Sequence, residues 1–411
     1  MAENDLIAGL DLGTTKVCVI VAERTEDGLD VIGIGSEPCQ GLKKGMVIDI
    51  DTTIRAIRAA VDQVETMAGC DVGLVYAGIA GSHVKGFNKD SFVAITDHEV
   101  TAADVKRVLD QSKAFPLKDD MQVIHVLPQE FAVDEHDGIK WPVSMNGIRL
   151  EARVHVVTAS NAAIQNIMRC AERCDLQVAE VVLEPLASAE AVLSQDEKEI
   201  GVALIDIGGG TTDIIVYVND AVVHTSVIPI GGVNLTKDIS AGLRTSIPEA
   251  ERIKVKYGCA SASMIDPSET IEVPSVGGRP PRIMLREVLA QIIEPRVEEI
   301  IYAAHHVLTE TGFIDMLASG VVITGGATLL DGMPEMAEHI MGIPVRRGNP
   351  IGVGGLVDVI KSPAYATAVG LIKYGANQLR SRGHEDPGNK VVRASSWPWS
   401  LRLGGWIREV F

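Results

Sequence analysis

Two stretches of the chain share one pattern of apolar and polar positions. Each begins with an apolar run that reaches an aspartate, continues through a glycine turn and paired threonines, and ends in a second apolar run rich in β-branched residues. The first copy reads IAGLDLGTTKVCVIVAE from residue 7, and the second reads ALIDIGGGTTDIIVYV from residue 203. Such runs around a tip of small residues predict a β-hairpin. Because the hairpin occurs twice, the chain is predicted to contain two similar halves.

The segments that follow the first hairpin add helices. Residues 53–68 and 161–174 show helical spacing, with Ile54, Ile57 and Val61 along one face of the first of them. Strands that are followed by helices indicate an architecture of α/β layers. We therefore expect two α/β lobes, each built around one copy of the hairpin.

Two segments interrupt this pattern and are predicted to be inserted subdomains. Residues 85–160 contain short strands such as VIHVLPQEFAV and RVHVVTAS, with one helix over Ala102–Ser112 that Thr101 opens. Residues 243–305 pass from SIPEAERIKVKYG through a loop-like stretch to a helix around Leu285–Val307. The chain then returns with ASGVVITGGATLLDG, which predicts a strand, a glycine turn and a helix.

The chain changes character again near its end. From Asn377 to Ser395 it is polar, rich in Gly, Pro and charge, and without hydrophobic periodicity, which is typical of a flexible linker. The predicted organisation is 1–84 and 161–197 for the first lobe, 85–160 for the first insertion, 198–242 and 306–376 for the second lobe, 243–305 for the second insertion, 377–395 for the linker, and 396–411 for an amphipathic helix.

Composition limits the classes of function. With 411 residues, 46% of them apolar, the chain can fill more than one core. Its formal net charge of −18 excludes non-specific nucleic-acid binding and means that contact with anionic lipid requires a local exception. The six cysteines show no paired metal-ligand spacing, which suits a reducing compartment, and the start lacks a signal pattern. We expect a cytoplasmic body.

The two hairpin tips have the chemistry of phosphate-binding loops. Phosphates need open backbone N–H groups, hydroxyl donors and little side-chain bulk. An alternative for a single copy is an ordinary tight hairpin, but two matched copies favour a joint site. The candidate loop residues are Gly13, Thr14, Thr15 and Lys16 in the first tip, and Gly208, Gly209, Gly210, Thr211 and Thr212 in the second.

An aspartate ends the strand that leads into each tip. If the halves face each other, Asp11 and Asp206 converge beside the phosphates, where two carboxylates require a divalent cation between them. Magnesium is the natural choice because it keeps its waters and is usually held by one or two carboxylates plus phosphate oxygens. We expect both aspartates to hold Mg²⁺ through waters. Asp213 is a further candidate for this outer shell, with a solvent-facing strand position as the alternative.

These motifs carry a resemblance to a known superfamily. The DLGTTK hairpin, DIGGGTTD and ITGGATLLDG are similar to the two phosphate motifs and the adenosine motif of the actin, Hsp70 and sugar-kinase superfamily, over residues 5–376. The resemblance implies a duplicated, two-lobed, actin-like (ribonuclease H-like) ATPase fold that binds ATP and Mg²⁺. It also implies that adenosine is held by Gly325 and Gly326 and by the AERIKVKYG stretch, here Glu251 and Lys254.

The same resemblance supplies a candidate for catalysis. LEPLASAEAVL is similar to the connecting helix where related filament proteins place an acidic residue that orders the attacking water, which here is Glu184. Phosphoryl transfer depends mostly on positioning and charge stabilisation. The alternative is a carboxylate that merely starts a helix before Pro185. At most a weak ATPase is expected, and whether hydrolysis occurs stays open.

The last residues form a locally basic segment in an otherwise acidic chain, as contact with an anionic membrane requires. From Lys390 to Phe411 there are four basic side chains and one acidic, a sum of +3. Together with tryptophans, this is the pattern of a helix that lies in an anionic membrane surface. A terminal helix docked on the protein itself or on a partner is the alternative. The apolar face consists of Trp399, Leu403, Trp406 and Val410, flanked by Ile407 and Phe411.

An actin-like body, an insertion after GIAGSHVKG, the LAQIIEPRVEEI helix and the amphipathic tail together resemble the FtsA family of bacterial cell division proteins across essentially the whole chain. The resemblance implies a peripheral protein on the cytoplasmic face of the inner membrane at the division site. It would anchor FtsZ filaments of the Z ring, self-assemble and recruit later division proteins. The second insertion would bind the FtsZ C-terminal peptide. Its candidate contacts are Arg279, Arg282, Arg286 and Arg296, with a solvated helix face as the alternative.

Other members of the superfamily remain alternatives at this point. A phosphotransferase such as a sugar kinase shares both phosphate loops, but we identify no catalytic base that faces a substrate pocket. An Hsp70 chaperone continues into a substrate-binding domain, whereas only about 35 residues follow the core here. A pilus-assembly actin homologue is also possible, and the amphipathic tail argues against it.

Overall fold

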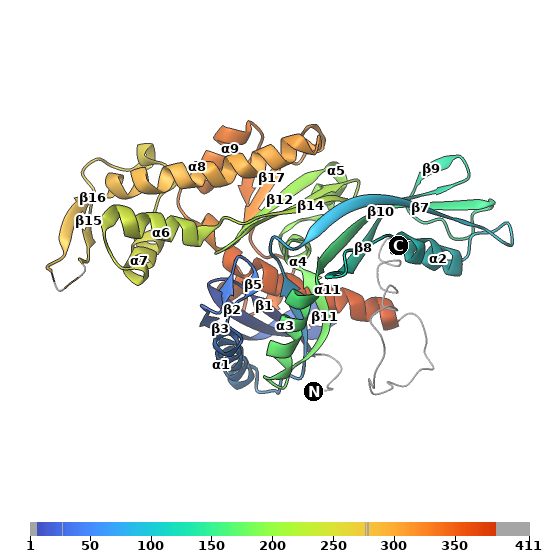
Figure 1. Cartoon of the computed structure of the whole chain (residues 1–411), viewed down its shortest axis with the longest axis horizontal. Helices are drawn as coiled ribbons and strands as arrows, with labels where there is room; N and C mark the ends of the chain where they lie inside the picture. Colours follow the sequence, from blue (N-terminus) through green and yellow to red (C-terminus); the bar gives the residue numbers. More distant parts are fainter. Residues whose placement is uncertain (1–5, 27, 276, 278, 384–411) are drawn as a thin grey trace.

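The computed structural model describes residues 6–383, except for residues 27, 276 and 278. Two lobes, each built on a β-sheet, form the centre of the molecule, and two smaller subdomains extend from opposite sides (Figure 1). The first sheet has six strands in the order β11-β6-β1-β2-β3-β19, and the second has five in the order β14-β13-β12-β17-β18. The expected fold, two lobes with two insertions, is confirmed.

The two sheets repeat one connectivity. In each, three consecutive strands form an antiparallel meander, and a later strand pairs in parallel with the first strand of that meander. The predicted hairpins are therefore β1–β2 and β12–β13. The strand bounds are β1 Leu6–Leu12, β2 Lys16–Thr25, β3 Gly28–Pro38, β6 Leu74–Ile79, β11 Gln177–Leu183 and β19 Gly354–Gly355 in the first sheet, and β12 Val202–Ile207, β13 Thr212–Val218, β14 Ala221–Ile228, β17 Val321–Thr324 and β18 Val345–Arg347 in the second.

Helices cover both sheets because their apolar faces match the strands. In α1, the predicted stripe Ile54, Ile57 and Val61 is buried against β2 and β3. Asp49 caps this helix by accepting from the Thr52 N–H at 3.0 Å. The helix bounds are α1 Ile50–Ala68, α3 Asn161–Glu172, α4 Glu184–Val192, α5 Gln195–Ile200, α6 Gly232–Leu243, α7 Ile247–Tyr257, α8 Arg286–Glu310, α9 Met333–Met341, α10 Val357–Ile360 and α11 Ala366–Gly383.

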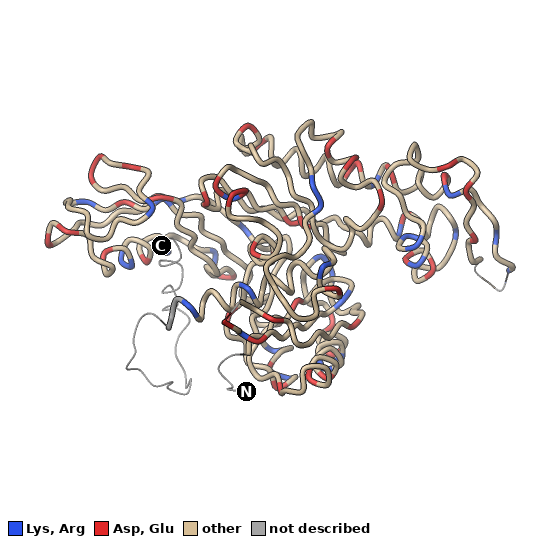
Figure 2. Tube along the Cα trace, turned by 180° about the vertical axis from the view of Figure 1, so that it is seen from behind, with Lys and Arg blue, Asp and Glu red and all other residues tan. Residues whose placement is uncertain are grey.

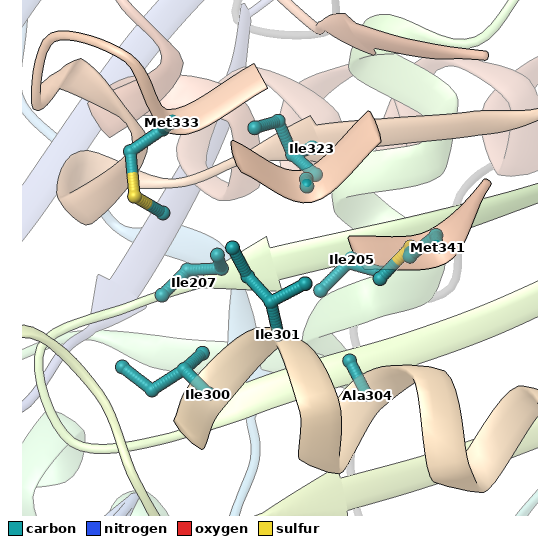
Figure 3. Close-up of a pocket in the computed structure, with 9 residues that line it drawn as sticks. Ile205, Ile207, Ile300, Ile301, Ala304, Ile323, Met333 and Met341 are labelled. Carbon is teal, nitrogen blue, oxygen red and sulfur yellow. The ribbon is translucent and has the colours of Figure 1, made fainter. Parts of the chain in front are cut away.

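The core of the second lobe lies between its sheet and helices α8 and α9. Ile205 and Ile323 from the sheet face Ile301 of α8 across an apolar cavity of about 10 Å³ (Figure 3). A space of this size with no polar lining holds neither a ligand nor a well-bonded water. This region is therefore a packed core.

The segment 85–160 forms a four-stranded sheet, in the order β7-β10-β8-β9, that extends away from the lobes (Figure 1). Helix α2, Ala102–Ser112, covers it and has the predicted bounds. Thr101 and Asp104 form a reciprocal capping box at its start, which a sequence pattern can reveal because it is local. The strand bounds are β7 Lys85–Ala94, β8 Met121–Val133, β9 His136–Ile139 and β10 Arg149–Ser160.

The opposite extension contains α6, α7, the start of α8 and a small hairpin of β15, Thr270–Val273, and β16, Arg282–Leu285. Two further strands of two residues each, β4 Leu42–Lys43 and β5 Met46–Val47, pair with each other in the segment after β3. Helix α8 starts one residue later and ends three residues later than expected from the sequence.

One predicted boundary is wrong. Residues 354–376, assigned to the second lobe, belong to the first, because β19 pairs with β3 and α11 packs on α4 and β1. Leu371 and Ile372 are fully buried in that core. The chain therefore crosses between the lobes twice, and the two crossings lie side by side, since the Ile351 N–H donates to the Ala191 carbonyl at 2.9 Å.

The predicted linker also starts too early. Helix α11 continues through residues 377–383, where a linker was expected from the polar composition. The structural reason is that Gln378 is buried and Leu379 packs against the first-lobe core, so that one face of this polar stretch still has apolar surroundings. The remainder of the linker, 384–395, and the predicted terminal helix, 396–411, lie outside the described residues.

Candidate functional site

The two hairpin tips meet between the lobes. A Cβ atom at Gly209 would lie 2.6 Å from Thr15 Cγ2, and one at Gly210 would lie 2.4 Å from Thr14 Oγ1. A side chain at either position would force the facing threonine to move, so close approach and not turn geometry favours glycine here. The structure thus brings the two predicted phosphate loops together.

Four carboxylates lie behind these loops. Asp11 is the last residue but one of β1, while Asp206 and Asp213 are directly opposite each other on β12 and β13. Glu184 begins α4, and its side chain lies over Gly78, where a Cβ atom would be 3.2 Å from Glu184 Oε1. Like charges directly opposite each other on a sheet repel. The carboxylates can therefore all be charged only if a cation lies close to them.

Hydroxyl groups hold two of these carboxylates in place. Ser188 Oγ donates to Asp206 Oδ2 at 2.6 Å, and Thr367 Oγ1 donates to the same oxygen at 3.3 Å. Thr211 Oγ1 donates to Asp213 Oδ2 at 2.8 Å, but Asp213 Oδ1 is buried without a partner. An orphaned carboxylate oxygen inside a site indicates a missing donor or cation.

Burial sets the charge of this cluster. It raises the pKa of Asp11 to about 6, against the opposing effect of Lys16 and with a further increase from Asp206. It raises the pKa of Asp213 to about 8, with Asp206 adding to the increase. Burial also raises the pKa of Glu184 well above its ordinary value, and repulsion from Asp11 raises it further. The pKa of Asp206 rises by burial, which the Ser188 hydrogen bond opposes.

The residues fit a hydrated Mg²⁺. Within the described residues, no three His, Cys, Asp or Glu side chains are close enough together to hold a metal directly. A cluster of separated carboxylates matches the preference of Mg²⁺ for keeping its waters and for phosphate oxygens. Asp11 and Asp206 would hold the hydrated ion, with Asp213 completing the outer shell, and the ion would neutralise phosphate charge.

The raised pKa values predict how stability depends on pH without a cation. The folded state binds protons at Asp11 and Asp213 more tightly than the unfolded chain does, so their contribution to stability is complete below about pH 4 and is lost as pH rises through about 6 and 8. We expect Asp213→Asn to raise the melting temperature of the nucleotide-free protein by several degrees at pH 8 and to change it little at pH 4.5. Thermal unfolding monitored by circular dichroism measures this, and an equal shift at both pH values would contradict it.

Lys16 bonds a distant loop, although its charge still lowers the pKa of the nearby Asp11. Its Nζ donates to the Ala364 carbonyl at 2.6 Å and lies 3.9 Å above the ring of Tyr365. Sequence reasoning missed Ala364 and Tyr365, because no local pattern links residues 348 positions apart. Ser188 and Thr367 were missed for the same reason.

The predicted adenosine residues divide into two groups. Gly325 has φ +91°, and a Cβ atom there would lie 2.3 Å from Asp206 Oδ1, so only glycine suits this turn. Lys254 Nζ bonds Glu251 at 2.8 Å and the Gly232 carbonyl at 3.2 Å. Gly232 in turn lies near Ala327, beside Gly326. The structure therefore brings Glu251 and Lys254 to the start of α6, opposite the glycine turn.

Thr236 and Gly232 belong to this side of the site and were missed. Thr236 Oγ1 bonds both Lys254 Nζ, at 3.0 Å, and the Glu251 carboxylate. The signal that could have revealed Gly232 is the Gly-Gly pair at 231–232, because it starts a helix just after a strand end.

The four candidate arginines are not equivalent. Arg286 bonds the Tyr257 carbonyl and Glu269, and Arg296 pairs with Asp238 at 2.7 Å, so both side chains are used within the subdomain. That these two meet an acidic peptide stays a prediction, and such a contact would compete with the internal carboxylate partner of each. Arg279 and Arg282 are exposed, although Arg282 also donates to the Leu243 carbonyl.

Comparison with known proteins identifies the family. A family model described as cell division protein FtsA matches residues 203–370, and one described as an SHS2 domain inserted in FtsA matches residues 81–158. The cell division protein FtsA of Pseudomonas aeruginosa is 48% identical over 414 residues, covering 99% of this chain and 98% of the relative. The chain belongs to the FtsA family.

Membership of the FtsA family settles the competing readings of the sequence. The pilus-assembly protein of a PilM–PilN complex has a similar fold, with a TM-score of 0.63 over 90% of this chain, but only 15% identity. An MreB5 of Spiroplasma citri, solved with ADP, gives a TM-score of 0.55 at 14% identity and covers 93% of this chain. These likenesses establish an actin-like fold alone. The SHS2 match coincides with the β7-β10-β8-β9 sheet, which in the FtsA family is an insertion.

The membrane residues predicted for this FtsA-family chain, Trp399 to Phe411, lie outside the described part of the structure. Among the helices that are described, none combines the length and apolar character needed to span a bilayer.

Proposed function

We propose that this FtsA-family protein binds ATP with Mg²⁺ between its lobes. The observation that carries this proposal is the contact between the tips at Thr14–Thr15 and Gly209–Gly210, with the buried Asp11, Asp206 and Asp213 and the half-buried Glu184 behind it. Hydroxyl and backbone N–H donors on both sides suit phosphates, and the carboxylates suit the metal that phosphates bring. The ADP in the MreB5 structure is in keeping with this use of the fold.

Glu184 is proposed to order an attacking water, so that any hydrolysis is slow and depends on positioning. In support of this proposal, its side chain lies beside Gly78, and the nearby Asp11 and Asp213 charges raise its pKa, so it belongs to the same carboxylate cluster. Burial and the nearby carboxylates raise the pKa of Glu184, so a cation in the site would favour its charged form.

We further propose that the protein couples FtsZ filaments to the inner face of the cytoplasmic membrane, assembles with itself and recruits later division proteins. In the second insertion, exposed apolar side chains lie near the basic ones: Ile283 is 69% exposed on β16, between Arg282 and Leu285. An apolar strand edge with flanking arginines suits an acidic, partly apolar peptide such as an FtsZ C-terminus. Arg279 and Arg282 are the arginines proposed for this contact.

The anionic membrane surface is the proposed partner of residues 396–411. Trp399, Leu403 and Trp406 form one side of the predicted helix, and the local charge of +3 opposes the −18 of the whole chain. One short helix gives modest affinity, so stable attachment is proposed to require several linked copies.

Vesicle sedimentation with FtsZ tests the tether. We expect Trp406→Glu to lower the fraction of protein that pellets with anionic vesicles at least about tenfold, because losing one buried indole and adding a charge exceeds the roughly 1.4 kcal/mol that a tenfold change requires. FtsZ should fail to pellet in parallel. Leu401→Glu, on the opposite side of the predicted helix, is the matched control. Equal pelleting of wild type and Trp406→Glu would contradict the tether, and FtsZ left in solution by membrane-bound wild type would contradict the coupling.

A further inference from the structure

Strand β8 of the first inserted subdomain has side chains that bond both lobes. In β8, the pairing with β10 shifts register twice, which leaves Ile124 and Gln129 as extra residues. Bulges of this kind re-aim neighbouring side chains. The two β8 side chains that bond the lobes, His125 and Gln129, lie next to or at these bulges.

At one end of this stretch, His125 bonds the first lobe beside the candidate catalytic carboxylate. Its Nε2 accepts the Leu183 N–H at 3.0 Å, and its side chain is only 5% exposed. Leu183 ends β11 and precedes Glu184, the first residue of α4. No side chain caps the start of α4, so this backbone bond helps to fix the turn that carries Glu184.

The packing around His125 keeps its ring in one orientation. The ring makes an edge contact with Tyr374, whose hydroxyl donates to Glu180 Oε1 at 2.8 Å. Burial lowers the pKa of His125 to about 4, so the ring is neutral at physiological pH and Nε2 can accept a hydrogen bond.

At the other end, polar residues of the same subdomain bond β14, the edge strand of the second lobe. Gln129 Nε2 donates to the Val222 carbonyl at 2.8 Å, and Asn88 Nδ2 donates to the Val223 carbonyl at 3.0 Å. His155, which is fully buried, bridges Asn88 Oδ1 at 2.7 Å and Thr225 Oγ1 at 2.9 Å. A Cβ atom at Gly86 would lie 2.1 Å from Thr225 Oγ1, so the two sheets touch closely there.

We propose that the inserted subdomain braces the two lobes, with His125 as a positioning residue for the Leu183–Glu184 turn and Asn88 as the centre of the attachment to β14. The brace limits how far the lobes separate and so slows nucleotide release. The inference rests on the proposed nucleotide site for its functional readout, but the brace itself can be measured in the nucleotide-free protein.

A brace restrains the lobes only while both of its ends are attached, so breaking either end should release it. Breaking both ends should then add little to the effect of breaking one. His125→Phe keeps a ring but loses the acceptor, Asn88→Ala removes the centre of the β14 contacts, and the double variant loses both. With full-length protein and ADP carrying a fluorescent N-methylanthraniloyl group, we expect each single variant to raise the dissociation rate constant about fivefold, the factor that one neutral hydrogen bond contributes. The double variant should exceed the larger single effect by no more than about twofold.

Controls separate positioning from general damage. His125→Gln, which keeps an acceptor near the Nε2 position, should restore a rate close to wild type, and Asn146→Ala, an exposed asparagine of the same subdomain, should have no effect. An effect of the double variant that equals the product of the single effects, about 25-fold, would show independent contacts and overturn the brace. Unchanged rates in both single variants would overturn it as well.

Hydrogen exchange of the nucleotide-free protein gives the second readout. His125→Phe should speed exchange not only at Leu183 but also about fivefold in residues 221–228 of β14, which His125 does not touch. A change confined to Leu183 would overturn the brace. If wild type binds no ADP, the proposed function fails, and this exchange measurement alone decides the inference.

Discussion

Replacing Asp206 with asparagine should weaken the binding of Mg²⁺–ATP at least about 30-fold and strengthen the binding of ATP without Mg²⁺ several-fold. The side chain keeps its size and its contact with Ser188 Oγ, so only the charge changes. With Mg²⁺ present, the loss removes a carboxylate that attracts the hydrated ion. Without Mg²⁺, it removes a carboxylate that repels the phosphates, and a change of about 1.4 kcal/mol corresponds to a factor of ten.

Calorimetric titration with ATP, in excess Mg²⁺ and in excess chelator, measures both constants. Asp137→Asn, an exposed aspartate of the inserted subdomain, controls for net charge. The opposite sign of the two changes is the informative result. If Asp206→Asn weakened binding equally with and without Mg²⁺, the residue would serve the fold and not the ion.

Gly370→Ala should lower the free energy of unfolding by about 3 kcal/mol or more. Glycine to alanine inside a helix ordinarily stabilises by about 1 kcal/mol. Here a Cβ atom would lie 1.7 Å from the Ala187 carbonyl oxygen, because α11 and α4 pack backbone to backbone at this point. Neither helix can yield without disturbing the buried Leu371 and Leu186 beside it, and overpacking of this kind costs at least 1–3 kcal/mol.

Urea unfolding of the full chain, followed by circular dichroism, checks this value. Gly73→Ala is the matched control, since a Cβ atom there meets nothing within 4 Å and the backbone is not left-handed. A neutral or stabilising Gly370→Ala would mean that α11 does not pack against α4 as described, and the reassignment of this helix to the first lobe would fall with it.

The parts of the fold that the sequence predicted are those fixed by local signals. The paired hairpins follow from the repeated aspartate, glycine and threonine pattern, and α2 follows from the capping box of Thr101 and Asp104. The first-lobe position of α11 has no such signal. Its apolar residues mark it as a packed helix, but the sheet that receives it is decided by contacts with α4, formed nearly 200 residues earlier.

The candidate site divides in the same way. The loop glycines and Asp206 come from recognisable motifs, whereas Ser188, Thr367 and Tyr365 reach the site through tertiary packing alone. The sequence could not distinguish among the candidate arginines, because the internal carboxylate partners of Arg286 and Arg296 are visible only in the structure. His125 is the extreme case, since its bond to Leu183 lies beside a bulge that no periodicity predicts.

The double crossing of the chain between the lobes restricts their relative motion. The two crossings are adjacent, because the Ile351 N–H bonds the Ala191 carbonyl. Together they define a single hinge axis for rotation of one lobe against the other. The inserted sheet meets β14, which is the edge of the second sheet farthest from β18, so this third attachment lies off that axis. An attachment off the hinge axis blocks rotation of the second lobe as a rigid unit. Any rotation of the lobes must therefore be accompanied by bending or tilting of the inserted sheet.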